Sequence, residues 1–257
     1  MKMLFAIALL VPTVAIAASP FDGTWKTQPD SIQFSSKPDI YELKQGIYTC
    51  SSCVPPYSVK ADGTDQKVTG HSYFDTAAVQ VIDARTVQFV GKLGGKETFS
   101  NSVAVSADGA TLTATFKDMS GAQVGTGTTI SKRVAAGAPG SHAISGSWKT
   151  EKMSEVSDVE ATVTYKTTAD GLQMQWNGQS YDAKFDGKQY LTANDPGKTW
   201  VSLKRISANT IEETDTRDGH VVDVYRMTVS ADGKTMTVVD NDVRQGTTSE
   251  YKTLKQP

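Results

Sequence analysis

The residue pair whose type and spacing most suggest chemistry is Cys50 and Cys53, separated by two serines. A C-x-x-C pair exchanges thiols and disulfides when a helix N-terminus or a nearby cation stabilises one thiolate. The residues that follow, Val54 to Tyr57, include two prolines and do not suit the first turn of a helix. The sequence also lacks the adjacent His of a c-type haem site and the second cysteine pair of a zinc site. We predict a local disulfide that staples a loop in an oxidising compartment, with a redox role as the alternative.

Other catalytic and metal-binding patterns are sparse in the sequence. Three isolated histidines form neither an H-x-H nor an H-x-x-x-H ligand pair: His71, His142 and His220. Glu212 and Glu213 are adjacent, so on a strand they face opposite ways and cannot share a proton. Asp240 and Asp242 share a face, but their neighbours lack the further oxygen ligands of a calcium loop. We therefore predict no catalytic residue, no metal site and no cofactor.

Four residues are candidates for binding a small ligand: Tyr57, Tyr181, Arg205 and Tyr225. Side chains alternate along a strand, and each tyrosine falls on the apolar face of its segment, which should point inward. Arg205 shares the apolar face of residues 201–205, and an inward guanidinium can bond both oxygens of a ligand's carboxylate. The alternative for Arg205 is a position at the strand end, with the charge extended into solvent.

The overall charge of the chain excludes two classes of partner. It has 26 Lys and Arg residues against 28 Asp and Glu residues, for a formal net charge of −2. A nearly neutral chain has no basic field to hold nucleic acid or an anionic membrane surface. No segment reaches the about 20 apolar residues that span a bilayer. We expect neither nucleic-acid binding nor a membrane span.

The N-terminus has the parts of a cleaved secretory signal. Lys2 precedes an apolar run at residues 4–11. Ala15 and Ala17 follow with the A-x-A spacing of a signal peptidase site. The run is too short for a membrane anchor. We predict that residues 1–17 are a signal peptide and that the mature protein is secreted or periplasmic.

The rest of the chain is a tandem repeat. FDGTWKT near the start matches ISGSWKT in the middle, and their tryptophans, Trp25 and Trp148, lie 123 residues apart. VSADGATLT at 105–113 matches VSADGKTMT at 229–237 at an offset of 124. The predicted units are repeat 1 at residues 19–134, a linker of small residues at 135–143, and repeat 2 at 144–257.

Each repeat is expected to consist of β-strands. Seven Asp-Gly dipeptides punctuate the chain, and Asp-Gly suits the positive φ angles of two-residue hairpin turns. Most of them separate short runs rich in Thr and Val, at the spacing of about 8–12 residues typical of barrels and sandwiches. Closure is favoured because it removes exposed strand edges. The predicted fold class is all-β, with two tandem antiparallel up-and-down β-barrels from an internal duplication.

Each repeat begins with a Gly-x-Trp strand and ends with a basic residue on its last strand. These residues are Trp25 and Arg133 in repeat 1, and Trp148 and Lys255 in repeat 2. At an offset of 124 the match of Arg133 is Pro257, so Lys255 must substitute for it. The pattern resembles the calycin group, the lipocalins and fatty-acid-binding proteins, and is similar to secreted bacterial lipocalin-like domains. The resemblance implies a structural role, in which each Trp lies at the closed end of a barrel with a basic side chain across it.

These features favour a binding protein over an enzyme. We expect an exported, non-catalytic carrier or sequestering protein for a small apolar or amphipathic ligand such as a lipid. The alternative is a protein-interaction or inhibitor module of the cell envelope, whose barrels are filled by side chains. A cavity of roughly a few hundred Å³ lined by the four candidate residues would favour ligand binding. An enzyme is a third class, and a cluster of convergent polar groups inside one barrel would favour it.

Overall fold

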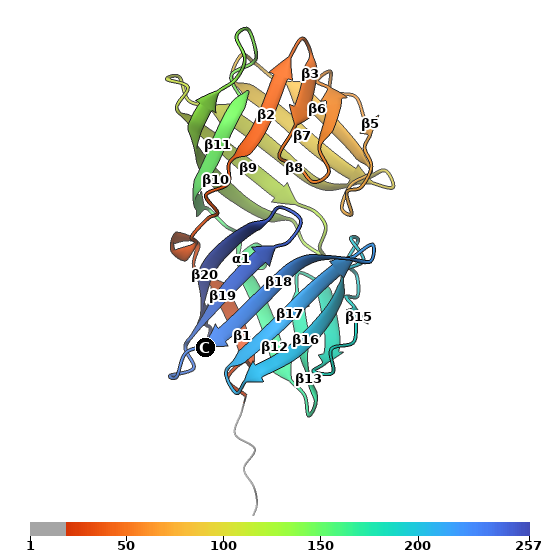
Figure 1. The fold of residues 1–257 in the computed structure, drawn as a ribbon, viewed down its shortest axis with the longest axis vertical. Helices are drawn as coiled ribbons and strands as arrows, with labels where there is room; N and C mark the ends of the chain where they lie inside the picture. The colour runs from red at the N-terminus through yellow and green to blue at the C-terminus, as the bar shows by residue number, and fades with distance from the viewer. Residues whose placement is uncertain (1–18) are drawn as a thin grey trace, which may run out of the picture.

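Two β-barrels stacked end to end make up the structure (Figure 1). The computed structural model describes residues 19–257, in which each barrel is a nearly closed sheet of ten antiparallel strands. This confirms the predicted all-β class with two tandem antiparallel barrels. The predicted signal peptide at residues 1–17 lies outside the described residues. Within residues 19–257, η1 (Pro29–Ser31) and α1 (Asp158–Ala161) are short, and no helix is long and apolar enough to cross a membrane.

Ten strands form the N-terminal barrel. In order across the sheet they are β4 (Tyr57–Lys60), β3 (Ile47–Cys50), β2 (Asp39–Lys44), β11 (Gly146–Ser154), β10 (Gly125–Ala136), β9 (Thr111–Asp118), β8 (Lys96–Val105), β7 (Thr86–Leu93), β6 (Thr76–Val81) and β5 (Gln66–Lys67). An isolated bridge between Asp62 and Gln80 brings the chain after β4 beside β6. The two edges of the sheet therefore meet, and the barrel nearly closes.

Ten strands also form the C-terminal barrel. In order across the sheet they are β14 (Gln179–Lys184), β13 (Gly171–Trp176), β12 (Thr162–Thr167), β1 (Gly23–Thr27), β20 (Thr247–Lys255), β19 (Thr235–Asp242), β18 (His220–Val229), β17 (Thr210–Arg217), β16 (Trp200–Ser207) and β15 (Tyr190–Leu191). A bridge between Ser180 and Ala193 closes this sheet in the equivalent place.

The first strand of each repeat lies in the barrel of the other repeat. β1 opens repeat 1 but pairs with β12 and β20 in the C-terminal barrel. β11 opens repeat 2 but pairs with β10 and β2 in the N-terminal barrel. In Figure 1 the orange-red β1 therefore lies among blue and teal strands, and the green β11 lies beside the orange β2. Each barrel thus contains one strand of the other repeat.

The connection between β10 and β11 accounts for the position of β11. Ala135 and Ala136, which fall in the predicted linker, extend β10, so only residues 137–145 separate the two strands. Consecutive strands joined by a short connection usually pair. β11 therefore pairs with β10 and is the Gly-x-Trp strand of the N-terminal barrel. β1 is the Gly-x-Trp strand of the C-terminal barrel.

One Asp-Gly dipeptide forms the predicted two-residue hairpin turn, and Asp218 is the only one of the seven Asp residues in such dipeptides with a positive φ angle. Asp218 and Gly219 join β17 to β18 with φ angles of 51° and 77°. Two successive positive φ angles are the geometry of a type I′ hairpin turn, which matches the right-handed twist of the strands. Glycine adopts such an angle without steric cost, and Asp tolerates it better than most residues.

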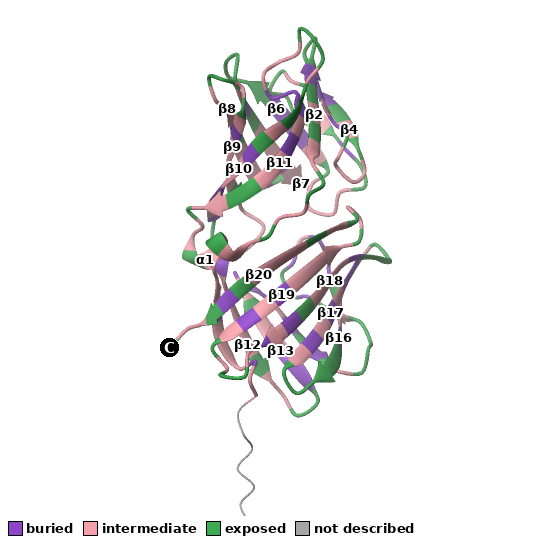
Figure 2. Cartoon of the chain, turned by 60° about the vertical axis from the view of Figure 1, so that its left-hand side comes forward, coloured by how far each residue is buried: buried purple, intermediate pink, exposed green. Residues whose placement is uncertain are grey.

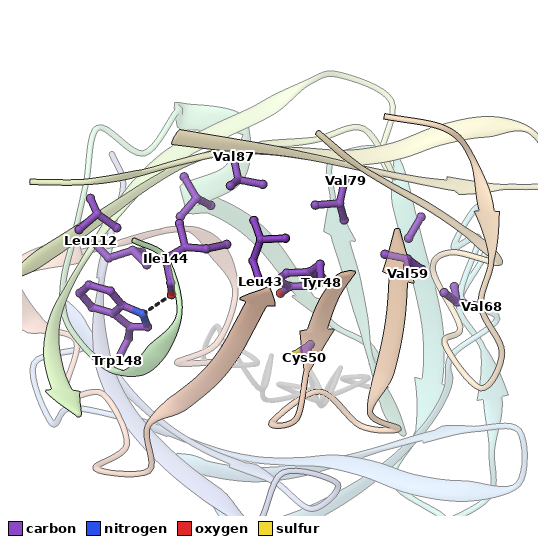
Figure 3. Close-up of a cluster of buried hydrophobic side chains, with 13 residues drawn as sticks. Leu43, Tyr48, Cys50, Val59, Val68, Val79, Val87, Leu112, Ile144 and Trp148 are labelled. Atoms are coloured by element: carbon purple, nitrogen blue, oxygen red, sulfur yellow. Dashed lines mark hydrogen bonds between the residues drawn. The ribbon is translucent and has the colours of Figure 1, made fainter. Parts of the chain in front are cut away.

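Each barrel has its own apolar core, built around one tryptophan. Trp148 is buried in the N-terminal core, and its Nε1 donates a hydrogen bond of 2.8 Å to the carbonyl oxygen of Ile144 (Figure 3). Trp25 is buried in the C-terminal core and donates in the same way to Phe21 at 2.8 Å. A buried indole N–H needs such a partner. The tryptophans therefore belong to the packing of the barrels.

A basic side chain covers each tryptophan. The guanidinium of Arg133 lies 3.9 Å from the ring centroid of Trp148, and Nζ of Lys255 lies 5.3 Å from that of Trp25. Because of the strand exchange, each of these pairs joins repeat 1 to repeat 2. Residues 119–124 connect β9 to β10, against 243–246 between β19 and β20, so the offset falls to 122 and Lys255 matches Arg133.

Several contacts hold the two barrels together. Figure 2 shows the short helix α1 between them. Asn177 of the C-terminal barrel accepts a bond from the Gln123 backbone and donates one back, both at 2.9 Å. Arg244, in the loop between β19 and β20, donates to the carbonyl oxygens of Val54 and Gly70 at 2.5 and 3.1 Å. Loops of each barrel therefore border the end of the other.

Candidate ligand-binding cavities

Each barrel contains a cavity near the boundary between the barrels. The cavity of the N-terminal barrel measures about 430 Å³ and that of the C-terminal barrel about 450 Å³. Gln245 of the C-terminal barrel reaches the first cavity, and Tyr73 of the N-terminal barrel reaches the second. A hollow of about 530 Å³ between them shares Phe99 with the first cavity and Trp176 with the second. Each mouth therefore borders the other barrel.

The cavity of the N-terminal barrel, which we call the aromatic cavity, is lined by Trp148 of the core and by seven further residues with rings. They are Tyr41, Tyr48, Tyr57, His71, Phe74, Phe89 and Phe99. Neighbouring ring centroids in this set lie between 4.4 and 6.2 Å apart. Tyr48 extends from β3 into the apolar core (Figure 3). Such a wall offers both flat faces and ring edges to a ligand.

Polar groups in the aromatic cavity favour their neutral forms. Burial raises the pKa of Asp39, which hydrogen bonds to neighbouring side chains partly oppose. Burial lowers the pKa of His71, and the charge of Arg244 adds to that shift. Nε2 of His71 has no hydrogen-bond partner within residues 19–257. Among the described residues, no Lys or Arg side chain lines this cavity. It therefore suits a neutral molecule better than a carboxylate.

The cavity of the C-terminal barrel, which we call the acidic cavity, contains two carboxylates of β17. Alternation turns Glu213 and Asp215 inward, each only 8% exposed, while Glu212 faces outward and pairs with Arg226 at 2.9 Å. The Tyr181 hydroxyl donates to Oε2 of Glu213 at 2.6 Å. Burial raises the pKa of both inward carboxyls, and the charge of Glu213 further raises the pKa of Asp215.

Two more carboxylates continue the inward faces of neighbouring strands. Burial raises the pKa of Asp240 on β19 to about 7 and also raises that of Asp223 on β18. Arg217 Nη1 lies 3.6 Å from Oδ2 of Asp223, and its Nε donates to the Thr199 hydroxyl at 2.8 Å. Among the described residues, Arg217 is the only Lys or Arg that lines the acidic cavity. One cation thus accompanies the four inward carboxylates of β17, β18 and β19, and Glu160 and Asp195 also line the cavity.

The two repeats place different chemistry at equivalent positions. Aligned strand by strand at an offset of 124, the four carboxylates match residues without charge: Glu213 with Phe89, Asp215 with Gly91, Asp223 with Phe99, and Asp240 with Phe116. Gly91 lies opposite Phe99 in the sheet, and a Cβ at Gly91 would lie 2.0 Å from the Phe99 ring. Gly91 therefore leaves room for the Phe99 ring. The C-terminal barrel has Asp215 paired with Asp223 at the same two positions.

The structure separates the four residues predicted to bind a ligand. Tyr57 lines the aromatic cavity and Tyr225 lines the acidic cavity. Tyr181 is buried in the C-terminal barrel and contacts the acidic cavity through its bond to Glu213. Arg205 is exposed near the end of β16, lies 4.4 Å over the Phe185 ring and lines neither cavity. The inward position expected for Arg205 is not found, because at a strand end its charge remains hydrated.

Sequence reasoning missed the inward carboxylates of β17. It compared Glu213 with its direct neighbour Glu212, which the strand turns to the opposite face. The useful signal was the alternation of Ile211, Glu213 and Asp215, where a buried apolar residue marks the inward face. Ile211 matches Val87 of repeat 1, which is also fully buried. That match would have identified Glu213 and Asp215 as inward carboxylates.

The cysteines contribute to the wall of the aromatic cavity. Cys50 and Cys53 form a disulfide in the loop between β3 and β4, and Cys53 lines the cavity. Within residues 19–257, no group of three or more His, Cys, Asp or Glu side chains is arranged to hold a metal ion.

In comparisons with known proteins, no family model, no curated protein and no solved structure matches this chain.

Proposed function

We propose that this chain is an exported, non-catalytic carrier or sequestering protein for a small apolar ligand, held in the aromatic cavity. The observation that carries the proposal is a space of about 430 Å³ inside the N-terminal barrel, lined by eight residues with rings. That volume lies within the range of about 300–1,000 Å³ common for small-molecule sites. The mostly apolar lining favours burial of a molecule with little polarity.

The proposed ligand is neutral, and aromatic or aliphatic in character. Tyr48 and Phe89 have ring centroids 4.9 Å apart and offer an edge and a face to a flat molecule. Nε2 of His71 offers one free hydrogen-bonding position for a single polar group. A fatty acid fits less well, because no Lys or Arg of residues 19–257, Arg205 included, lines this cavity to neutralise a carboxylate.

Export and a lipocalin-like lineage are part of the proposal. A Gly-x-Trp strand with a basic side chain across the indole in both barrels supports kinship with the calycin group. The N-terminal signal pattern and the Cys50–Cys53 disulfide support a secreted or periplasmic protein, since disulfides persist in oxidising compartments. The competing role as an interaction module with filled barrels is disfavoured by the two cavities.

A fluorescent probe tests the proposal directly. N-phenyl-1-naphthylamine is neutral and apolar, and we expect its emission to rise on saturable binding to the full chain. Ala114→Leu narrows the aromatic cavity and should weaken binding at least about tenfold, equivalent to 1.4 kcal/mol. Val238→Leu is the matched control, since Val238 holds the equivalent position in the acidic cavity. Circular dichroism melts verify that both variants fold.

The natural ligand is sought in protein purified from its own host. Native mass spectrometry before and after organic extraction should reveal a bound mass that extraction removes. The proposal would be overturned if the probe bound the wild-type chain and Ala114→Leu equally well. It would also be overturned if the probe failed to bind and every host preparation had the mass of the chain alone.

A further inference from the structure

The acidic cavity has the features of a second binding site of a different chemical class. We propose that it binds a small organic ammonium ion, with Asp215 as the ion-pair partner and tyrosine rings around the carbon skeleton. This goes beyond the proposed function, which concerns a neutral ligand in the other barrel. The two sites share no lining residue, so each can fail independently.

Asp215 supplies the unsatisfied group that points to a ligand. It lines the acidic cavity, is 8% exposed, and its Oδ1 has no hydrogen-bond partner among the described residues. A buried polar atom without a partner costs free energy, so such an atom commonly marks a missing donor. An ammonium N–H donates to a carboxylate with both charge and direction.

The two charged groups on either side of Asp215 along β17 are already engaged. Glu213 accepts the Tyr181 hydroxyl, and Arg217 is shared between Asp223 and Thr199. Among the described residues, Glu160 and Asp240 also have an oxygen without a partner, but of these three carboxylates only Asp215 both lines the acidic cavity and is less than a tenth exposed. A cationic ligand would supply the charge that this part of the barrel lacks.

Aromatic side chains complete the site. Tyr165, Tyr225 and Tyr251 line the same cavity, and the faces of such rings attract ammonium ions. Met227 and Met236 add apolar wall for the carbon skeleton. With a volume of about 450 Å³ the cavity has room for an amine that carries one aromatic ring.

The repeat itself indicates that these carboxylates are not needed for folding. The N-terminal barrel has the same topology with Phe89, Gly91, Phe99 and Phe116 at the four matching positions. Burying four carboxylates in the other barrel costs stability. Binding of a cationic ligand explains why the C-terminal barrel has these carboxylates although they cost stability and the fold does not require them.

The test compares three molecules that share one skeleton and differ in charge. Isothermal titration of the full chain uses 2-phenylethylammonium, 2-phenylethanol and phenylacetate. We expect the ammonium ion to bind at least about tenfold more tightly than the alcohol or the carboxylate. Asp215→Asn should reduce ammonium binding at least about tenfold. Asp232→Asn is the matched control, because it removes one exposed charge from a turn at the far end of β18.

Each outcome decides the proposal. Retained folding of Asp215→Asn is checked by its melt, and Ala114→Leu should leave ammonium binding unchanged, which separates this site from the aromatic cavity. Equal binding of the amine and the alcohol would overturn the proposal. So would full affinity in Asp215→Asn, equal loss in Asp232→Asn, or conversion of the amine to a product, which would assign the carboxylates to catalysis.

Discussion

Asp215 and Glu213 show how one face of one strand determines the chemistry of a barrel. Both side chains are buried beside each other on β17, and burial raises the pKa of each. An acid with a raised pKa in the folded state binds its proton more tightly there than in the unfolded chain. The stability that each acid contributes is therefore fully present below its ordinary pKa and is lost as the pH rises through the raised value.

Replacing Asp215 with Asn should stabilise the free protein, and more so at high pH. The ordinary pKa of Asp is 3.8, and that of buried Asp215 lies well above it. At about pH 3, below that ordinary pKa, the folded and the unfolded wild-type chain both hold most of the proton, so Asp215→Asn changes little. At about pH 8 the wild-type chain loses stability and the variant does not, so the variant should melt about 2–4 °C higher for each kcal/mol gained.

Thermal melts of the two proteins at both pH values make the measurement. Glu213 lies beside Asp215 on the same strand, while Asp223, Asp195 and Arg217 carry the other nearby charges. They remain in the variant and keep part of the wild-type pH dependence. A melting temperature for Asp215→Asn below that of the wild-type chain at about pH 8 would show that Asp215 stabilises the fold.

At the scale of residues, the sequence predicts which face of a strand a residue occupies better than it predicts which residues form a binding site. Alternation predicts that Tyr57 and Tyr225 face inward, where each lines a cavity, and the resemblance to the calycin group assigns both tryptophans to packing. Alternation does not determine whether the Arg205 side chain faces inward or solvent, because that depends on how close Arg205 lies to the end of β16. It also does not show that Asp215 lacks a donor, because that depends on Arg217 engaging Asp223 across two strands.

At the scale of elements, the exchange of β1 and β11 is the main feature of the architecture. The Gly-x-Trp strands of the two repeats are similar in sequence, so either could fill either barrel. The repeat, its turns and the barrel class follow from the sequence. The exchange does not, because it depends on the pairing of β11 with β10 through a short connection.

Trp25→Ala should destabilise the C-terminal barrel, although Trp25 belongs to repeat 1. Trp25 is fully buried among C-terminal residues, and removing a large core aromatic costs about 3–5 kcal/mol. Hydrogen exchange read by mass spectrometry should show lost protection in β12 and β20, which flank β1. Trp148→Ala is the matched control and should affect β2 and β10. Lost protection in β2 and β10 of Trp25→Ala would contradict the exchange.

At the scale of the whole molecule, one duplication has produced two cavities of unlike chemistry. The barrels share topology and the tryptophan with its basic cover, while their interiors differ at four matched positions. Tyr73 and Gln245 each border the cavity of the opposite barrel, so the two cavities lie close to one boundary. The central claim is that these are two independent binding sites, for a neutral molecule and for an ammonium ion.

Native mass spectrometry of the full chain with both probes present tests that claim most directly. We predict a ternary complex of one chain, one N-phenyl-1-naphthylamine and one 2-phenylethylammonium. Ala114→Leu should lose only the neutral probe and Asp215→Asn only the ammonium ion. Loss of both probes from either variant, with its fold intact, would contradict two independent sites, as would the absence of any complex with the wild-type chain.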